Sequence, residues 1–244
     1  MHPRNQHKKG YNFTALTNIC PELQSLILVN AHGIKTVNFF NPVAVKLLNQ
    51  ALLKLHYNID VWDIPENHLC PPIPSRADYV HYAADLLAQS NRGILPKGKS
   101  VRCVDVGTGA SCIYPLLGHQ IYGWQFIASD IYAPSLAASQ LILNKNPALK
   151  TAIQLRLQSN PKAIFRKFLR PNERIDFSFC NPPFYISAEA AQAAAQRKLR
   201  QLNAPKKSVA NFGGQQHQKW CTGGDVRFIH AMIQESQEFK DTCL

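Results

Sequence analysis

The sequence predicts an α/β fold built around a mostly parallel sheet. From residue 100 onward, short apolar runs of strand length alternate with segments of helical periodicity. The predicted strands span 101–106, 124–128, 153–158 and 174–180, and the predicted helices begin at Ser111 and cover 134–145. Because strand–helix–strand units join parallel strands through right-handed crossovers, this order predicts a Rossmann-like sheet with helices packed against it.

Two further regions precede this sheet in the chain. Residues 1–40 mix basic with aromatic side chains and carry no acidic residue before Glu22, so we expect a basic N-terminal arm outside the core. Residues 41–98 show helical periodicity on both sides of a proline-rich connector, which predicts a helical extension. The expected organisation is therefore an arm at 1–40, a helical extension at 41–98 and a Rossmann-like domain at 99–244.

The helical extension contains two predicted helices. Asn41 followed by Pro42 favours a helix over 42–56, because an asparagine side chain caps free backbone N–H groups and proline suits the first helical position. Ser75 is the expected cap of the second helix, which runs to about Gln89. One face of this second helix is expected to carry Tyr79, Tyr82, Ala83 and Leu86.

Composition limits the function classes. The 244 residues include 27 Lys and Arg against 15 Asp and Glu, a formal charge of +12, which favours a nucleic-acid partner. No apolar run approaches the length of a membrane span, and the first nine residues have no apolar leader, so we expect a cytoplasmic protein that does not enter membranes. The seven cysteines form no Cys-x-x-Cys pair, so we expect reduced thiols and no metal site.

A glycine-containing loop follows the first predicted strand. It runs from Asp105 through Gly107 and Gly109 to Ser111, where a parallel sheet binds its ligands. Cys112 stands at the third glycine position of the dinucleotide fingerprint, which disfavours a pyrophosphate and favours S-adenosylmethionine as the cofactor. At the end of the next strand, Asp130 is placed to accept hydrogen bonds from two ribose hydroxyls.

The tetrapeptide Asn181-Pro182-Pro183-Phe184 follows the fourth predicted strand. Two consecutive prolines stiffen the loop. The Asn181 amide oxygen and the Pro182 carbonyl could each accept one N–H of a conjugated amine and direct its nitrogen lone pair at a sulfonium methyl. Phe184 could stack on a flat base held outside its helix or loop. We therefore expect these four residues to be catalytic.

Basic residues are segregated along the chain. No acid lies between Asp130 and Glu173 or between Glu189 and Asp225. We expect RNA phosphates to contact such runs. The first run contains Lys145, Lys150, Arg156, Lys162, Arg166, Lys167 and Arg170. The second contains Arg197, Lys198, Arg200, Lys206, Lys207 and Lys219, and the N-terminal arm adds Arg4, Lys8 and Lys9.

Six motifs together resemble the ribosomal RNA large subunit methyltransferase F type of 23S rRNA adenine-N6 methyltransferases, over almost the whole chain. They are His2-Pro3-Arg4-Asn5, Asn41-Pro42-x-Ala44-Val45, Pro74-x-Arg76-x-Asp78-Tyr79-x-His81, the loop 105–115, the tetrapeptide 181–184 and Asn211-Phe212-Gly213-Gly214-Gln215-Gln216. The motifs are shared with eukaryotic enzymes that methylate adenine in a spliceosomal RNA and a messenger RNA hairpin. The resemblance implies a class I methyltransferase fold and 23S rRNA, or a large-subunit precursor, as the partner.

The resemblance also assigns roles to residues. It implies that Arg76 meets the methionine carboxylate of the cofactor, that Gly107 and Ser111 contact the cofactor, and that Asp130 binds the ribose. It implies that the tetrapeptide 181–184 receives the target adenine. Without the resemblance, Arg76 is an ordinary residue of a first helical turn.

One departure from the family pattern leaves alternatives open. Methyltransferases of this fold usually have seven strands, whereas the residues after Phe184 read as a basic insertion, a turn at Gly223-Gly224 and a helix over 225–240. We therefore expect strands five to seven to be absent and the fourth strand to lie near an open edge. The alternatives are a glutamine-N5 methyltransferase acting on a release factor, which typically carries Tyr in place of Phe184, and a catalytically silent RNA-binding protein. We expect a monomer.

Overall fold

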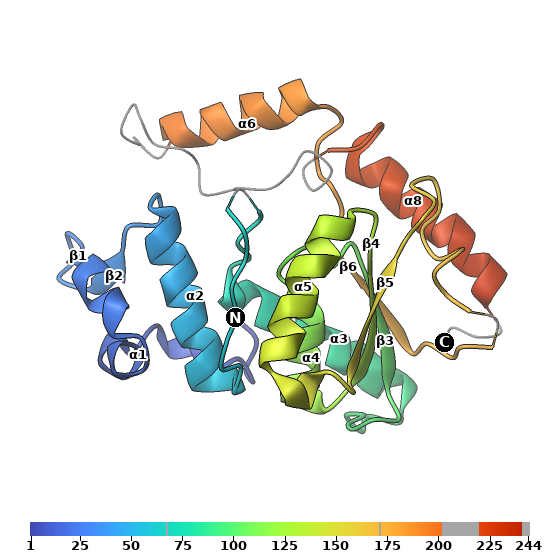
Figure 1. The fold of residues 1–244 in the computed structure, drawn as a ribbon, viewed down its shortest axis with the longest axis horizontal. Helices are drawn as coiled ribbons and strands as arrows, with labels where there is room; N and C mark the ends of the chain where they lie inside the picture. The colour runs from blue at the N-terminus through green and yellow to red at the C-terminus, as the bar shows by residue number, and fades with distance from the viewer. Residues whose placement is uncertain (67, 171, 202–219, 241–244) are drawn as a thin grey trace.

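The computed structural model describes residues 1–66, 68–170, 172–201 and 220–240. In Figure 1 the N-terminal elements occupy one end of the molecule and the sheet occupies the centre. Helix α8 (Gly224–Ser236) lies at the opposite end, and α6 (Ala188–Gln201) crosses above the other elements. No helix in the described ranges is long and apolar enough to cross a membrane.

The central sheet of the described chain has four parallel strands, which confirms the predicted fold class. They are β3 (Arg102–Val106), β4 (Gln125–Asp130), β5 (Ile153–Leu157) and β6 (Phe177–Cys180), in the order β5-β4-β3-β6. Val104 of β3 is in register with Ile127 of β4 on one side and with Ser178 of β6 on the other. The order reverses between β3 and β6, and parallel sheets bind ligands beside such a reversal.

Three helices cover one face of the sheet. They are α3 (Ile73–Ser90), α4 (Ile113–Tyr122) and α5 (Ala133–Lys145), and a short 3-10 turn, η3 (Pro147–Leu149), follows α5. Cys103, Phe126 and Phe179 project from three strands into the core beneath these helices. A Cβ atom added at Gly118 of α4 would lie 2.4 Å from the Phe126 ring, so the glycine permits the close approach of α4 to β4.

The opposite face of the sheet packs against α8, residues 164–169 and Ile175. Because successive strand residues point to opposite faces, Val104 and Ile127 lie here with Phe165. The buried carboxylate of Glu235 in α8 accepts hydrogen bonds from the backbone N–H groups of Ile164, Phe165 and Arg166, at 3.0, 2.8 and 2.5 Å. The turn η4 (Gln237–Phe239) continues α8.

The N-terminal region is folded against the rest of the chain, and the expectation of an arm outside the core is wrong. Phe13, Leu16 and Leu23 are buried in the same hydrophobic cluster as the sheet residues. The apolar residues of this region were spaced too irregularly for sequence reasoning to separate short helices from loop. Its elements are η1 (Gln6–Lys9), α1 (Phe13–Ile19), η2 (Pro21–Leu26), β1 (Ile27–Val29), β2 (Lys35–Val37) and α2 (Pro42–Tyr57).

Helix α2 begins as predicted, whereas α3 differs in two respects. The Asn41 side chain caps α2 by accepting from Val43 N and Ala44 N. Helix α3 already starts at Ile73, because Pro74 is tolerated in the first turn of a helix. No side chain caps it. The Ser75 hydroxyl does not act as a cap but donates to Pro72 O. The expected apolar face is also rotated: Tyr82 and Leu86 are exposed, and the buried positions include Ala77, Val80 and Ala84. Small residues are needed there because α3 packs against both α2 and α4.

The end of the described chain follows the predicted elements. Ser187 caps α6, with its hydroxyl accepting from Ala190 N, and Gly223 and Gly224 both have positive φ before α8. Strand β6 is the outer strand of the sheet within the described ranges. Beyond it, Tyr185 forms a parallel bridge with Trp220, and Cys221 N donates to Tyr185 O at 3.0 Å.

Candidate active site

A cavity of about 230 Å³ lies at the carboxyl ends of the strands, beside the reversal between β3 and β6. Its lining brings together eight of the predicted catalytic and cofactor residues. They are Arg76, Asp105, Gly107, Gly109, Ser111, Asp130, Asn181 and Pro183. A second hollow, of about 490 Å³, lies toward the amino ends of the strands and contains none of these residues. The chemistry predicted from the sequence therefore converges on one place.

The glycine loop is held by β4. Gly107 N and Thr108 N both donate to Ser129 O at 2.9 Å. Gly107 and Gly109 have φ of +74° and +65°, a backbone conformation that side chains with a Cβ rarely adopt. Cys112, at the third glycine position, also has a positive φ of +50° although it carries a side chain. The loop thus keeps the shape of a glycine-rich turn and leaves backbone exposed to the cavity.

Asp105 is buried beside this loop. Neither of its carboxylate oxygens has a hydrogen bond of good geometry to a described residue. Burial, reinforced by the negative charge of Asp130, raises the pKa of Asp105 to about 7, against the opposing effects of the Thr108 hydroxyl and the Arg76 charge. A buried carboxyl without partners fits a site that awaits a cationic or N–H-bearing ligand.

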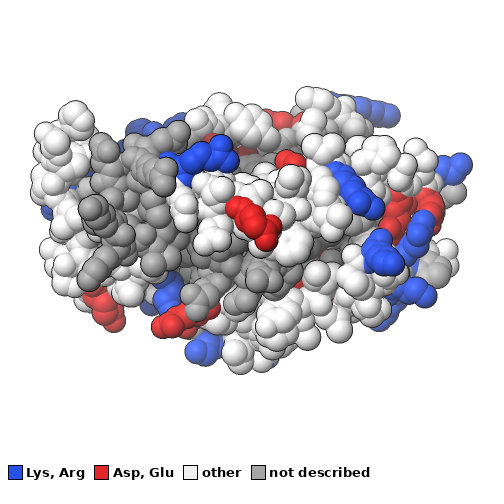
Figure 2. Space-filling view, turned by 90° about the horizontal axis from the view of Figure 1, so that it is seen from above, with Lys and Arg blue, Asp and Glu red and all other residues white. Residues whose placement is uncertain are grey.

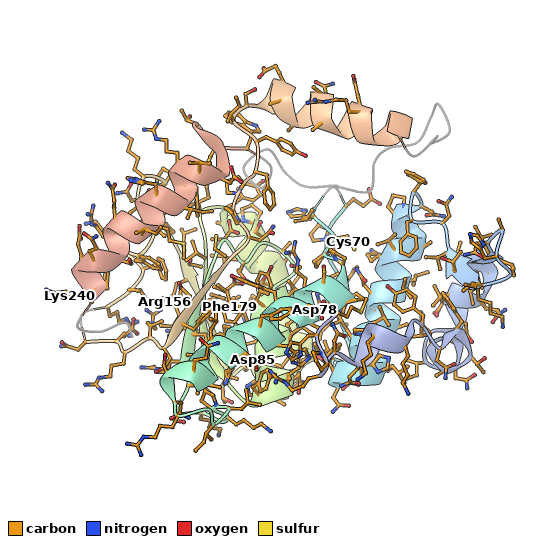
Figure 3. All side chains as sticks on the ribbon, turned by 180° about the vertical axis from the view of Figure 1, so that it is seen from behind. Cys70, Asp78, Asp85, Arg156, Phe179 and Lys240 are labelled. Atoms are coloured by element: carbon orange, nitrogen blue, oxygen red, sulfur yellow. The ribbon has the colours of Figure 1, made fainter. Side chains whose placement is uncertain are left out.

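Arg76 projects from the first turn of α3 into the same cavity. Its Nη1 donates to the Tyr114 hydroxyl at 2.6 Å, and its guanidinium carbon lies 5.4 Å from the centre of the Tyr114 ring. Tyr114 is buried and stacks on Phe179 of β6, which Figure 3 shows behind α3. The guanidinium is therefore oriented by a rigid aromatic pair, with other N–H donors available for an anionic group.

Asp130 links the end of β4 to the glycine loop. Its Oδ2 accepts from Gly109 N and its Oδ1 accepts from Tyr132 N, both at 2.8 Å. Each carboxylate oxygen can accept more than one hydrogen bond, so these contacts are compatible with a ribose. Asp130 therefore positions the loop itself, a role that the sequence did not predict.

The tetrapeptide 181–184 leaves β6 at the edge of the cavity. Asn181 and Pro183 line the cavity, whereas Pro182 and Phe184 are not part of its lining. The Asn181 side chain has no hydrogen bond to a described residue and is half-buried. Phe184 is 55% exposed. The corner thus brings the Asn181 amide to the cavity and leaves an exposed aromatic ring outside its lining.

The lining residues fit S-adenosylmethionine. Its amino-acid part carries an ammonium and a carboxylate, which match the buried Asp105 carboxyl and the Arg76 guanidinium. Its adenosine carries ribose hydroxyls for which Asp130 has acceptor capacity. No cluster of His, Cys, Asp and Glu able to hold a metal occurs among the described residues.

Several lining residues were not predicted from the sequence. Trp220 contributes an indole whose Nε1 is buried without a hydrogen-bond partner in the described chain. Leu69 and Pro71 reach the cavity from the connector before α3, and Gln158 and Ile164 reach it from the loop after β5. These residues are brought together only by tertiary structure, so no local motif marks them. Tyr114 lies within the glycine-loop motif, but the motif alone does not indicate its contact with Arg76.

The predicted RNA-binding residues are scattered. Lys8 and Lys9 are exposed near the N-terminus, and Arg197 is exposed on α6. Lys198 and Arg200 also belong to α6 but their side chains lie outside the described set, as do Lys206 and Lys207. In Figure 2, Lys and Arg of the described chain form several separate groups, with acidic side chains beside some of them.

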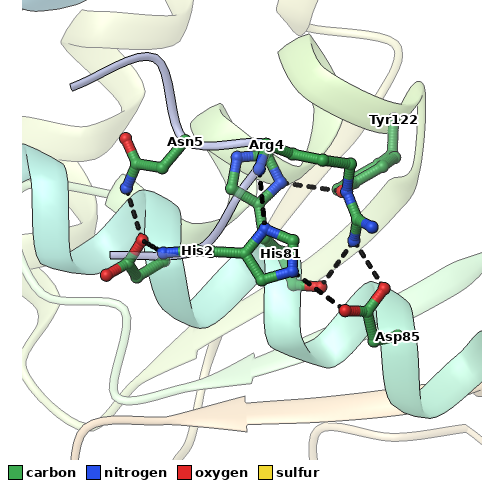
Figure 4. A network of polar contacts seen from close by, with 7 residues as sticks. His2, Arg4, Asn5, His81, Asp85 and Tyr122 are labelled. Atoms are coloured by element: carbon green, nitrogen blue, oxygen red, sulfur yellow. Dashed lines mark hydrogen bonds and ion pairs between the residues drawn. The ribbon is translucent and has the colours of Figure 1, made fainter. Parts of the chain in front are cut away.

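Several of the basic residues form hydrogen bonds within the chain, including Lys8, whose Nζ donates to Pro3 O at 2.8 Å. Arg4 donates to the Tyr122 hydroxyl, His81 O and Asp85 Oδ1, at 3.0, 3.0 and 2.6 Å (Figure 4). Arg156 binds both carboxylate oxygens of Glu173 at 2.5 and 2.6 Å in a largely buried pair, and Arg166 pairs with Glu238. These side chains hold the fold together, and their partners lie too far along the chain for sequence reasoning to predict them.

A family model described as RNA methyltransferase matches residues 1–244. This chain belongs to the RNA methyltransferase family. It is 50% identical to the ribosomal RNA large subunit methyltransferase F of Flavobacterium johnsoniae, covering 100% of this chain and 78% of that protein. It is 48% identical to the protein of the same name from Yersinia enterocolitica, covering 100% and 73%. The family resemblance drawn from the motifs is therefore confirmed.

Solved structures of this RNA methyltransferase family agree with the fold. The human METTL16 catalytic domain in complex with MAT2A 3′UTR hairpin 1 is 30% identical, with a TM-score of 0.81, and the match covers 100% of this chain and 79% of that chain. The N-terminal domain of human METTL16 in complex with SAH is 28% identical, with a TM-score of 0.73 over 100% and 80%. The chain is thus an enzyme that methylates RNA with S-adenosylmethionine as its cofactor.

Proposed function

We propose that this chain methylates the N6 amine of an adenine in 23S ribosomal RNA. The observation that carries the proposal is that Asn181 lines the same cavity as Arg76, Asp105 and Asp130. The names of the ribosomal RNA relatives support 23S rRNA, or a large-subunit precursor, as the substrate. We further propose that the enzyme acts as a monomer in the cytoplasm.

We propose that Arg76, Asp105 and Asp130 hold the cofactor, together with Gly107, Gly109 and Ser111. Arg76 pairs with its carboxylate, Asp105 with its ammonium and Asp130 with its ribose. The bound cofactor supplies a sulfonium methyl group that an amine can attack. The backbone of the glycine loop allows close approach, because no side chain stands at Gly107 or Gly109.

The tetrapeptide solves a specific chemical problem. The N6 amine of adenine is a weak nucleophile because its lone pair is delocalised into the ring. In our proposal the Asn181 amide oxygen and the Pro182 carbonyl each accept one N–H, which holds the nitrogen pyramidal, and Pro183 stiffens the corner. Phe184 stacks on the extruded base. No strong base is required, since the methylated amine is acidic and loses its proton readily.

Exposed cations would hold the RNA. Lys9 and Arg197 are exposed, and so is Lys8, whose Nζ also donates to Pro3 O. The remaining candidates by sequence are Lys198, Arg200, Lys206 and Lys207. Arg4 is a weaker candidate than the sequence indicated because its guanidinium is bound within the chain. Contacts of this kind give salt-dependent affinity without sequence preference. The base itself would be selected at the tetrapeptide.

The release-factor alternative has no structural observation in its favour. A glutamine side chain presents a similar amide nitrogen, but the relatives named for ribosomal RNA and the RNA-complexed neighbour support RNA. The silent RNA-binding alternative is set aside by membership of an enzyme family whose neighbour was solved with SAH.

The product of the reaction tests the proposal. Protein-free 23S rRNA and release factor are incubated separately with the chain and S-adenosylmethionine carrying a deuterated methyl group. Digestion of the RNA and mass spectrometry are expected to show deuterated N6-methyladenosine, and the release factor is expected to stay unlabelled. Label in another nucleoside, or in the release factor alone, would contradict the proposal.

A further inference from the structure

Residues 2–5 lie along α3 and bind its first turns (Figure 4). Asn5 is 1% exposed, and its Nδ2 donates to Pro74 O at 2.8 Å and to Asp78 Oδ1 at 2.6 Å. The Asn5 amide thus binds Pro74 and Asp78, which lie two positions before and two positions after Arg76. The other side of the amide is also used, because Oδ1 accepts from His7 N at 2.8 Å.

Besides Asn5, the buried Ile73 and the Ser75 hydroxyl, which donates to Pro72 O, fix the start of α3. No side chain caps the helix, and Pro72 and Pro74 supply no N–H groups at its first turn. The Arg76 N–H donates to Pro72 O at 3.2 Å, which is a long hydrogen bond. Asn5 ties this uncapped helix end to the N-terminal segment from outside the helix, because it donates to the Pro74 carbonyl and to the Asp78 carboxylate.

Asp78 completes this grip. Its Oδ1 also accepts from His2 N at 2.8 Å. Although burial acts to raise the pKa of Asp78, the hydrogen bonds from Asn5 and His2 hold it below its ordinary value. The carboxylate is therefore ionised at neutral pH and accepts strongly from the Asn5 amide.

We propose that Asn5 is a positioning residue for the cofactor, acting through Arg76. By fixing the first turn of α3, Asn5 holds the guanidinium where it can pair with the carboxylate end of S-adenosylmethionine. The inference rests on the proposed role of Arg76 and concerns the amino-acid part of the cofactor only. Adenosine recognition at Asp130 and the glycine loop lies on other elements and is independent of Asn5.

Two ligands distinguish recognition of the amino-acid part of the cofactor from recognition of its adenosine in a binding experiment without RNA. S-adenosylhomocysteine carries the amino-acid part, whereas 5′-methylthioadenosine keeps the adenosine and lacks it. Calorimetry on the full chain gives both affinities from one preparation, and their ratio does not depend on the fraction of folded protein. Asn5→Ala is expected to lower the affinity for S-adenosylhomocysteine about tenfold, which corresponds to the loss of one or two hydrogen bonds. The affinity for 5′-methylthioadenosine is expected to change by less than about twofold.

A double-variant cycle shows whether Asn5 acts through Arg76. Arg76→Met is expected to lower the ratio of the affinity for S-adenosylhomocysteine to the affinity for 5′-methylthioadenosine. Adding Asn5→Ala to Arg76→Met is expected to lower this ratio no further. Asp78→Asn keeps an acceptor without the charge and is expected to lower the ratio by a smaller factor than Asn5→Ala does. This variant provides the test if Asn5→Ala does not fold. Asp85→Asn is the matched control, since Asp85 is bound by His2 and Arg4 further along α3 and is expected to leave the ratio unchanged (Figure 3).

Three results would overturn the inference. They are an unchanged ratio in both Asn5→Ala and Asp78→Asn, an equal fall for both ligands, and an unchanged ratio in Arg76→Met. The choice of target base does not enter this experiment, so its failure is distinguishable from failure of adenine methylation.

Discussion

Two polar groups at the carboxyl ends of neighbouring strands define the chemistry at the residue scale. Asp105 of β3 is buried with unpaired oxygens, and the Asn181 amide follows β6 without a partner in the described chain. Polar groups left unpaired inside a folded chain cost stability unless a ligand satisfies them. In our proposal, Asp105 is the acceptor for the cofactor and Asn181 is the acceptor for the amine that is methylated.

The first prediction at this scale concerns pH. With a pKa of about 7, Asp105 is largely protonated at pH 6 and ionised at pH 8. Only the ionised form pairs with an ammonium, so S-adenosylhomocysteine is expected to bind several-fold more tightly at pH 8 than at pH 6. Calorimetry across this range measures the dependence. Asp105→Asn is expected to bind weakly and with a flat profile in this range, and an unchanged slope in that variant would contradict the assignment.

At the scale of elements, loops at the cavity are held by residues distant in sequence. The carboxylate of Glu235 in α8 accepts three backbone N–H groups from residues 164–166, and Ile164 of that loop lines the cavity. Arg156 pairs with Glu173 across the segment between β5 and β6. Helix α8 therefore covers a face of the sheet and also shapes the wall of the site.

Glu235 is predicted to stabilise the fold far more than its neighbour Glu238. Glu235→Ala leaves three backbone N–H groups without their buried acceptor and is expected to lower the free energy of unfolding by about 3 kcal/mol. Glu238→Ala removes a half-exposed pair with Arg166 and is expected to cost far less. Urea denaturation of the two variants measures the difference. Equal losses of unfolding free energy in the two variants would contradict this role of Glu235.

The sequence predicted elements better than it predicted their partners. Alternating apolar runs located all four strands of the described sheet, because a parallel sheet is buried on both faces and its strands read as apolar runs. The start of α3 was misplaced because Ser75 resembled a cap. Trp220 and Asn5 could not be assigned, since their roles arise from contacts with residues far along the chain. Arg76 was found only by resemblance.

At the scale of the whole molecule, the N-terminal region and the sheet share one hydrophobic core. Phe13 and Leu16 from the first helix are buried in the cluster that also holds Phe126 and Phe179. The contacts of His2, Arg4 and Asn5 with α3 add polar connections between the same regions. We therefore expect the N-terminal region to unfold together with the sheet and not as a separate arm.

Two buried histidines are predicted to make the whole molecule sensitive to acid. Burial lowers the pKa of His7 and of His81 to about 4, with neighbouring positive groups adding to the effect. The unfolded chain then binds more protons than the folded chain between about pH 4 and 6.5, so stability falls as pH decreases through this range.

Urea midpoints at pH 7, 5.5 and 4.5 measure this effect. Asp105 acts in the opposite sense, because its raised pKa favours the folded chain as pH decreases, so the series is best recorded in Asp105→Asn. His7→Gln combined with His81→Gln is expected to flatten the dependence, and an equally steep dependence in that variant would contradict it.

The most direct test of the whole account is the single-turnover rate of Asn181→Ala with 23S rRNA and S-adenosylmethionine both saturating. Loss of an amide that holds the reacting nitrogen is expected to lower this rate by about a hundredfold or more, while the Kd values for RNA and S-adenosylhomocysteine change by less than about threefold. Asn144→Ala, at an exposed position of α5, is the matched control and is expected to react at the rate of the unaltered chain. A rate for Asn181→Ala within a few-fold of that control would contradict the claim that this corner holds the amine for methyl transfer.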